Sequence, residues 1–340
     1  MGKVITFGEL MLRLSPEGNT RFLQTGRFDA AFGGSEANVA VCLANLGTDA
    51  SFVTKLPDNA IGHAAVRELR SFGVDTPHIA FGGERMGLYY MEKGVGERGS
   101  VCIYDRKHSA IAEASEADFD WDEIFDGADW FHFSGITPAL SDNAARLCML
   151  ACQSAKKRGL TVSCDLNYRS KLWTTEQAGR VMDALCRYAD ICFANEEDAA
   201  DVFGIRADDT DVVAGKLNRA GYTAVARQLT ERFGFRVVAV TLRTSLSASD
   251  NLWQAMLYRN GTCTFSREHT VRIVDRLGGG DSFAGALIYA LREGMDDRQS
   301  VEFAVAASAL AHTIEGDFCR VSVQEAMRLA SGDASGRVRR

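Results

Sequence analysis

The residues best suited to chemistry form one short run of three glycines and an aspartate, namely Gly278, Gly279, Gly280 and Asp281. A strand-like segment, Val271 to Val274, precedes this run, and Ser282 to Glu293 follows it with apolar residues at helical spacing. A strand, a glycine turn and a helix in this order make an anion site, because the turn exposes backbone N–H groups and the helix N-terminus adds partial positive charge. We therefore expect a phosphoryl group to bind on this turn.

Asp281 places a carboxylate beside that anion site. The position is electrostatically unfavourable unless the carboxylate has a task, and the natural task is to accept the proton of an attacking hydroxyl during phosphate transfer. The alternative is that Asp281 only caps the following helix. Three adjacent glycines are unusual for a plain cap, so the pattern favours a catalytic base.

The composition limits the class of protein. The chain has 340 residues, of which 46% are hydrophobic and 24% charged, so we expect a soluble globular protein. A net charge of -7 with scattered Lys and Arg predicts no nucleic-acid partner and no membrane partner. The nine cysteines include no Cys-x-x-Cys pair, and the N-terminus shows no signal peptide, so we expect buried thiols and a cytoplasmic location.

Apolar runs alternate with helical periodicity along most of the chain. This pattern predicts an α/β fold, a doubly wound and mostly parallel sheet with helices on both faces, in one domain over residues 1–330. The last ten residues, 331–340, read as a flexible tail. The predicted strands are 51–56, 130–134, 161–165, 191–194 and 236–242, and the clearest helices, 35–46, 59–72 and 142–158, each end at a glycine.

Two stretches, residues 9–32 and 83–110, interrupt this alternation. Within the second, 86–91 and 101–104 look like strands joined by a glycine-rich turn, so the two stretches are expected to form a small separate sheet. Asn260-Gly261 lies between two further strand-like runs and predicts a hairpin that adds antiparallel strands to the main sheet.

The run from Asp275 to Gly285 resembles the C-terminal signature of the ribokinase-like (PfkB) carbohydrate kinases, Asp-Thr-x-Gly-Ala-Gly-Asp-x-Phe-x-x-Gly. Order and spacing are kept, with Arg276 in place of Thr and Gly279 in place of Ala. A second run is similar to the family's N-terminal Gly-Gly-x-x-x-Asn-x-Ala signature, whose glycines lie against the sugar hydroxyls. Its residues are Gly33, Gly34 and Asn38.

The resemblance implies ATP and Mg²⁺ as cofactors, with a monovalent cation such as K⁺ near the glycine turn. It also implies that the small sheet is a lid that closes over the sugar and often mediates dimerisation. Asn195 and Asp198 match the family's Asn-x-x-Glu motif, which organises Mg²⁺ and the nucleotide phosphates, with Asp in place of Glu. Where relatives carry Gly-x-x-Gly, this chain has hydroxyl residues and an arginine that we expect beside the nucleotide: Thr241, Arg243 and Ser245.

The expected substrate depends on charge, because a sugar acid needs a cation and the planar arginine fork binds a carboxylate with two hydrogen bonds. Arg169 follows a predicted strand at the end where ligands collect in α/β sheets, and Arg106 ends a strand of the small sheet. The pattern is similar to that of 2-keto-3-deoxygluconate kinases within the family. That resemblance implies substrate contacts from Gly34, Tyr89, Tyr104, Arg106, Asn167 and Arg169.

Three alternatives remain open. Fructokinases carry similar Asp-x-Asn-x-Arg segments, so a neutral sugar is the second choice of substrate. A non-catalytic relative that binds sugar and nucleotide is a rival from another class, and Asp281 argues against it. An NAD-linked oxidoreductase would need a glycine fingerprint after its first strand, where Phe7-Gly8-Glu9-Leu10 stands instead.

Overall fold

The computed structural model describes residues 1–195, 197–206 and 219–333. In this part of the chain the main sheet has the strand order β13-β12-β11-β10-β9-β8-β1-β4-β5, and β14 pairs with β12. All pairs from β11 to β5 are parallel, and β12, β13 and β14 add antiparallel pairs at one edge. The strands are β1 (Lys3–Phe7), β4 (Ala50–Leu56), β5 (Ile79–Phe81), β8 (Ala128–Ser134), β9 (Thr161–Asp165), β10 (Ile191–Ala194), β11 (Val237–Ser245), β12 (Asp250–Arg259), β13 (Thr262–Phe265) and β14 (His269–Arg272). The predicted sheet is confirmed.

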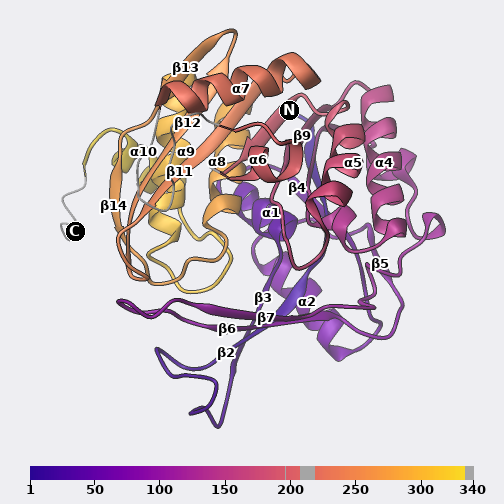
Figure 1. Ribbon diagram of the computed structural model, residues 1–340. Coiled ribbons are helices and arrows are strands. Elements are labelled where there is room, and N and C mark those ends of the chain that lie inside the picture. Colours follow the sequence, from indigo (N-terminus) through magenta and orange to yellow (C-terminus); the bar gives the residue numbers. More distant parts are fainter. Residues whose placement is uncertain (196, 207–218, 334–340) are drawn as a thin grey trace.

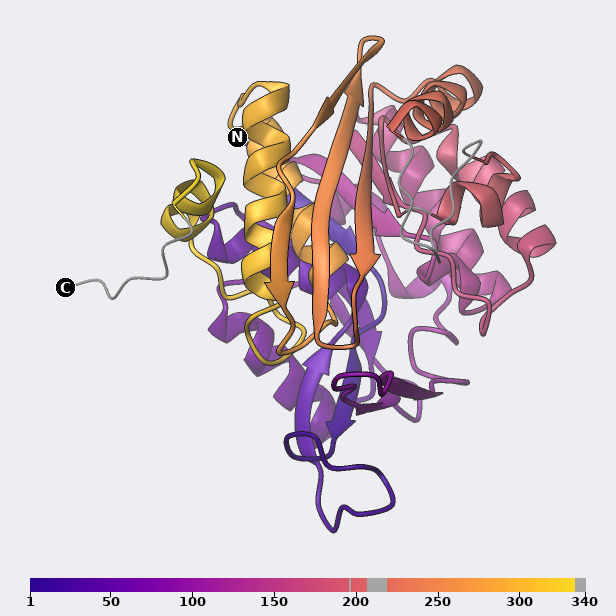
Figure 2. The same cartoon turned by 60° about the vertical axis from the view of Figure 1, so that its left-hand side comes forward.

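Helices cover both faces of this sheet (Figures 1 and 2). Successive strand residues point to opposite faces, so Val4 and Val237 join one apolar core while Ile5 and Val238 join the other. One face carries α1 (Ser35–Asn45), α2 (Ala60–Ser71), α8 (Gly279–Arg292), α9 (Asp297–Ala311) and α10 (Val323–Ala330). The other carries α3 (Trp121–Ile124), α4 (Asp142–Lys157), α5 (Thr175–Cys186), α6 (Asp198–Phe203) and α7 (Arg219–Phe233). Every helix in the described ranges is too short or too polar to traverse a bilayer.

The glycines predicted to end helices do so. Gly47, Gly73 and Gly159 follow α1, α2 and α4 in the left-handed region, at φ of 87°, 82° and 77°. Asn260 and Gly261 also have positive φ, 51° and 80°, and form the predicted hairpin between β12 and β13. Residues 334–340 of the predicted tail lie outside the described part of the chain.

Two boundaries beside the glycine turn differ from the prediction. Strand β14 ends at Arg272 instead of Val274, because the N–H groups of Val274 and Asp275 donate to the carbonyl of His312 rather than to a strand. Helix α8 begins at Gly279 instead of Ser282, since three glycines can adopt helical geometry as readily as they form a turn. Asp281 therefore lies inside the first helical turn.

A second, four-stranded sheet of order β3-β2-β6-β7 forms from the two stretches that interrupt the alternation, and we call it the lid sheet. Its strands are β2 (Met11–Ser15), β3 (Asp29–Gly33), β6 (Gly87–Glu92) and β7 (Val101–Asp105). It lies across the end of the main sheet where β11 finishes (Figures 1 and 2). The one Gly-x-Gly-x-x-Gly pattern of the chain, residues 94–99, connects β6 and β7, two strands of a hairpin, and so lacks the strand-to-helix context of a dinucleotide site.

Candidate active site

The glycine turn opens α8 with unoccupied backbone donors. Gly278 has φ of 73°, and a Cβ there would lie 2.1 Å from the carbonyl oxygen of Asp317, so only glycine fits. The first-turn amides of a helix have no intrahelical acceptor, and no side chain caps this one. The N–H groups of residues 278–281 are therefore available to an anion.

The carboxylate of Asp281 is held by α1. Its Oδ1 accepts a hydrogen bond from Ser35 Oγ at 2.6 Å, and its Oδ2 accepts one from Asn38 Nδ2 at 2.7 Å. Gly34 lets α1 begin this close to the chain after β1, because a Cβ at Gly34 would lie 2.0 Å from the carbonyl oxygen of Glu9. Asp281 thus does not cap α8, and the capping alternative is wrong.

Burial raises the pKa of Asp281 above its usual value, because the charged form loses its hydration. The hydrogen bonds from Ser35 and Asn38 and the positive charge of Arg169 lower the pKa and oppose that effect. A carboxylate with this balance is a stronger base than a solvated one and still has partners for its charge. It is suited to accept a proton from a hydroxyl.

Two cavities meet at Asp281. The larger, of about 370 Å³, extends over β9, β10, β11 and β12, and the smaller, of about 90 Å³, lies beneath the lid sheet. Both are lined by Asn167, Arg169, Gly278 and Asp281. A large and a small ligand could therefore touch each other at the glycine turn.

The smaller cavity contains every residue predicted to contact the sugar. Its lining includes Gly33, Gly34, Asn38, Tyr89, Tyr104, Arg106, Asn167 and Arg169. Arg106 is buried, and its Nε donates to Glu9 Oε2 at 2.7 Å while Nη2 donates to the same oxygen. Arg169 instead donates to the carbonyl of its neighbour Tyr168 at 3.0 Å, and within the described residues no carboxylate forms a salt bridge with it.

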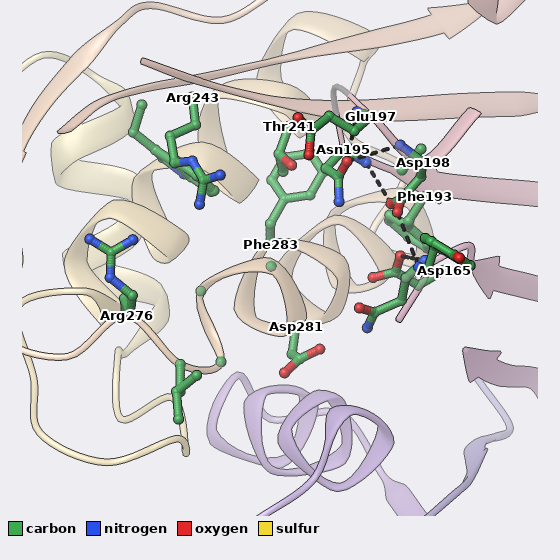
Figure 3. Close-up of a pocket in the computed structure, with 18 of the residues that line it drawn as sticks. Asp165, Phe193, Asn195, Glu197, Asp198, Thr241, Arg243, Arg276, Asp281 and Phe283 are labelled. Carbon is green, nitrogen blue, oxygen red and sulfur yellow. Dashed lines mark hydrogen bonds between the residues drawn. The ribbon is translucent and has the colours of Figure 1, made fainter. Parts of the chain in front are cut away.

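The larger cavity contains most of the residues predicted to contact the nucleotide (Figure 3). Asn195, Asp198, Thr241 and Arg243 line it together with the glycine turn. Ser245 is exposed at the end of β11 and lies outside the lining residues, because the strand has carried it past the cavity. Residue 196, between Asn195 and Glu197, is outside the described part of the chain.

Acidic residues on one side of the larger cavity fit a hydrated Mg²⁺ (Figure 3). Asp165 is buried, and its pKa is raised well above the usual value, first by burial and then by the charges of Asp198 and Asp281. Asp198 accepts backbone N–H groups of Tyr168 at 3.1 Å and Asn195 at 3.0 Å. Mg²⁺ commonly keeps several waters and binds through one or two carboxylates and the substrate phosphates, and Asp165 and Asp198 could supply those carboxylates.

A buried charge cluster connects the lid sheet to the chain on either side of the glycine turn. Arg13 of β2 donates from Nη2 to Asp275 Oδ2 and from Nη1 to Asp317 Oδ1, both at 2.7 Å. Tyr89 of β6 donates its hydroxyl to Asp317 Oδ2 at 2.6 Å. Burial raises the pKa of Asp317 to about 6, although the charge of Arg13 opposes this rise. This one carboxyl group therefore contacts two residues of the lid sheet, Arg13 and Tyr89.

Ser35, Asp165, Arg13 and Asp317 are among the residues of this site that were not predicted from the sequence. Ser35 lies inside the N-terminal signature, and Asp165 ends a predicted strand, so both had a positional signal. Arg13 and Asp317 had none, since they are 304 residues apart and only the fold brings them together. All four line the cavities or hold a residue that does.

The fold and site together define a kinase of small hydroxylated molecules, in which an anion-binding helix start and a buried base lie between two ligand cavities. Comparison with known sequences identifies the family. Residues 1–317 match the family described as pfkB family carbohydrate kinase. The chain belongs to this family, as its two signatures predicted.

Several relatives resemble the chain over nearly its whole length. The solved structure of 2-dehydro-3-deoxygluconokinase from Thermotoga maritima is 51% identical, with a TM-score of 0.95 over 98% of this chain and 100% of that one. A 2-dehydro-3-deoxygalactonokinase of Haloferax volcanii is 32% identical over 98% of both chains. A 2-dehydro-3-deoxygluconokinase of Thermoproteus tenax is 29% identical over 93% of this chain and 90% of its own. Plant fructokinases match at 26 to 27% identity.

Replacement of Ser35 by alanine tests how the pKa of Asp281 is set. The change removes one of the hydrogen bonds that lower this pKa, so the pKa should rise. If Asp281 must be ionised to act, phosphotransfer is lost as pH falls through its pKa, and the acid limb of the kcat/KM profile should move to higher pH. Ser71→Ala, at an exposed helix end, is the control. An unmoved limb, or a shift to lower pH, would contradict this account.

Proposed function

We propose that the protein transfers the terminal phosphoryl group of ATP to the C6 hydroxyl of 2-keto-3-deoxygluconate (2-dehydro-3-deoxygluconate), giving the 6-phosphate. The main observation is the position of Asp281, where a sugar-sized cavity lined by arginines meets a larger cavity at the start of α8. The relatives' names point to the same class of acid.

In the proposed reaction, Asp281 accepts the proton of the C6 hydroxyl as the oxygen–phosphorus bond forms and the bond to ADP breaks. The N–H groups of Gly278, Gly279, Gly280 and Asp281 donate to the transferring phosphoryl group, where negative charge must be stabilised. Mg²⁺, when bound beside Asp165 and Asp198, would neutralise charge on the nucleotide phosphates. Closure of the lid sheet would exclude water from the transfer step.

Replacement of Asp281 by asparagine should abolish most turnover while leaving the sugar bound. The amide keeps the size of the carboxylate but cannot accept the proton, so kcat should fall by about 10² to 10⁴. Steady-state kinetics gives kcat, and calorimetry with the sugar acid gives its affinity. Asp142→Asn, in an exposed first turn of α4, is the matched control. Near-normal kcat in Asp281→Asn would remove this residue from the mechanism and restore the non-catalytic rival.

Arg169 is the better candidate for the sugar carboxylate. Arg106 already shares two hydrogen bonds with Glu9, so its charge is neutralised and its fork is partly occupied. Arg169 lines both cavities, and among the described residues its recorded hydrogen bond goes to a neutral carbonyl. Truncating Arg106 would also leave Glu9 buried without its cation, which is costly to the fold. We therefore infer that Arg169 binds the acid and that Arg106, held by Glu9, shapes the pocket.

Replacement of Arg169 by alanine should act selectively on acid substrates. A lost hydrogen bond to a charged group costs about 1.5 to 3 kcal/mol, so kcat/KM for the sugar acid should fall by roughly 10- to 100-fold. The activity on fructose and ribose has no carboxylate contact to lose. ATP consumption against the sugar acid, fructose, ribose and adenosine measures this preference. If the ratio of kcat/KM for the sugar acid to kcat/KM for fructose did not change, Arg169 would not bind the carboxylate, and the fructokinase alternative would be favoured.

A second candidate substrate is 2-dehydro-3-deoxygalactonate. The Haloferax volcanii relative carries that activity in its name and matches the whole chain. The two acids share the carboxylate and the C6 hydroxyl and differ only in the configuration at C4. Both epimers therefore belong in the same assay, and the larger kcat/KM decides between them.

We infer that the protein is a homodimer joined through the outer face of the lid sheet. Strand register places Leu12, Leu14, Leu88, Tyr90 and Ile103 on one face, opposite the face that covers the cavity. Ile103 is 50% exposed, and the nearby Val101 and Phe28 are each 41% exposed. An apolar face of this kind marks an interaction site when it is contiguous.

A charge at an exposed apolar position of this face tests the dimer. Ile103→Lys should shift the mass measured by sedimentation from two chains to one, because lysine cannot be buried against a second apolar sheet. Met327→Lys, at an exposed apolar residue of α10, should leave the mass unchanged. A monomeric unmodified protein at the same concentration would refute the proposal.

Two further expectations stay predictions. A monovalent cation such as K⁺ beside the glycine turn is one of them. A cytoplasmic location is the other, and it agrees with the finding that all nine cysteines are free thiols.

A further inference from the structure

Arg276 is the residue at which this chain departs most from the family signature, since an arginine replaces a threonine within the glycine turn. Its Nη2 donates to the carbonyl oxygen of Ala248 at 2.9 Å, a neutral partner. The adjacent carboxylate of Asp275 is directed to Arg13, with which it forms a salt bridge at 2.7 Å. The acid beside Arg276 in sequence therefore forms its salt bridge with another arginine.

Arg243 reaches the same part of the larger cavity from a different element. It lies on β11, opposite Trp253 of β12, and both residues line the cavity together with Arg276. Figure 3 shows the two arginines on one side of this space and the acidic residues Asp165 and Asp198 on the other. Neither arginine lines the smaller, sugar-sized cavity.

Two like charges in a partly buried place repel each other. Burial lowers the pKa of Arg276 below its usual value, and the charge of Arg243 lowers it further. The same two charges also lower the pKa of the buried His312, after the larger effect of burial. An anion with several negative charges between the guanidinium groups would turn this repulsion into attraction.

We infer that Arg243 and Arg276 together form a clamp for the polyphosphate chain of the nucleotide donor, with Arg276 as a binding residue that the family signature does not supply. This inference rests on the proposed function, in which the larger cavity takes the nucleotide. With the terminal phosphoryl group on the amides of α8, the preceding phosphates lie toward the larger cavity and hence toward the arginines. The planar forks suit phosphate oxygens better than a single ammonium does.

The experiment replaces Arg276 by threonine, the residue that the family signature has there. The KM for ATP should rise by about 10- to 100-fold, as expected for lost hydrogen bonds to a charged group, while the KM for the sugar stays within about twofold. Calorimetry on the intact protein with inorganic tripolyphosphate should show the same weakening, and adenosine should bind as before. Arg276→Lys keeps the charge and should recover part of the lost affinity.

Arg272→Thr is the matched control, because Arg272 is 82% exposed at its side chain and lies outside the cavity lining. Thermal melting of each variant shows whether the bond to Ala248 is needed for folding. If Arg276→Thr does not fold, Arg243→Gln tests the other half of the clamp with the same ligands. Unchanged tripolyphosphate affinity in a folded variant, or an equal loss of adenosine binding, overturns the inference.

The test of the clamp can fail or succeed independently of the proposed sugar kinase activity. Tripolyphosphate binding needs no sugar, so a weakened variant supports the clamp even if no tested sugar is phosphorylated. Conversely, sugar acid phosphorylation with full tripolyphosphate affinity in Arg276→Thr would leave the kinase proposal intact and remove the clamp.

Discussion

The two hydrogen bonds that hold Asp281 are the interaction on which the site depends. They join residues 246 and 243 positions apart in sequence, Ser35 and Asn38 on α1 and the aspartate on α8. A buried carboxylate without partners is strongly destabilising, so the bonds fix the approach of the two helix starts as well as the orientation of the base. The glycines on both sides follow from this contact, since a side chain at Gly34 or Gly278 would collide with a backbone carbonyl.

Separation of charge organises the rest of the site. Asp165 and Asp198 lie on one side of the larger cavity, and Arg243 and Arg276 lie on the other (Figure 3). In the polar space between them, the phosphates of a metal-bound polyphosphate would face the arginines and the metal ion would face the carboxylates. Arg13 of the lid sheet forms salt bridges with two aspartates, one on each side of the glycine turn. Buried ion pairs therefore join the lid sheet to the chain on either side of the anion site.

Much of the fold was predictable because its signals are local. Apolar runs of strand length and helices that end at Gly47, Gly73 and Gly159 depend on neighbouring residues alone. The errors fell beside the glycine turn, where β14 ended early and α8 began early. Glycines carry little preference of their own there, and contacts with His312 and Asp317 decide the geometry. Ser245 was misplaced relative to the cavity for a similar reason, since the length of β11 is set by its pairing with β12.

The sequence by itself determined the part of the chemistry that depends on residues adjacent in the chain. Two short runs could be interpreted from the sequence alone: the glycine turn with Asp281, and Gly33 and Gly34 before a helix. Backbone freedom and the start of a helix depend on neighbouring residues and need no distant partner. Only the tertiary structure decided which charges are available. It paired Arg106 with Glu9, gave Arg169 no salt bridge among the described residues, and placed Arg243 and Arg276 in the lining of one cavity. Electrostatic pairing acts over distances of a few ångströms in space and is independent of separation along the chain.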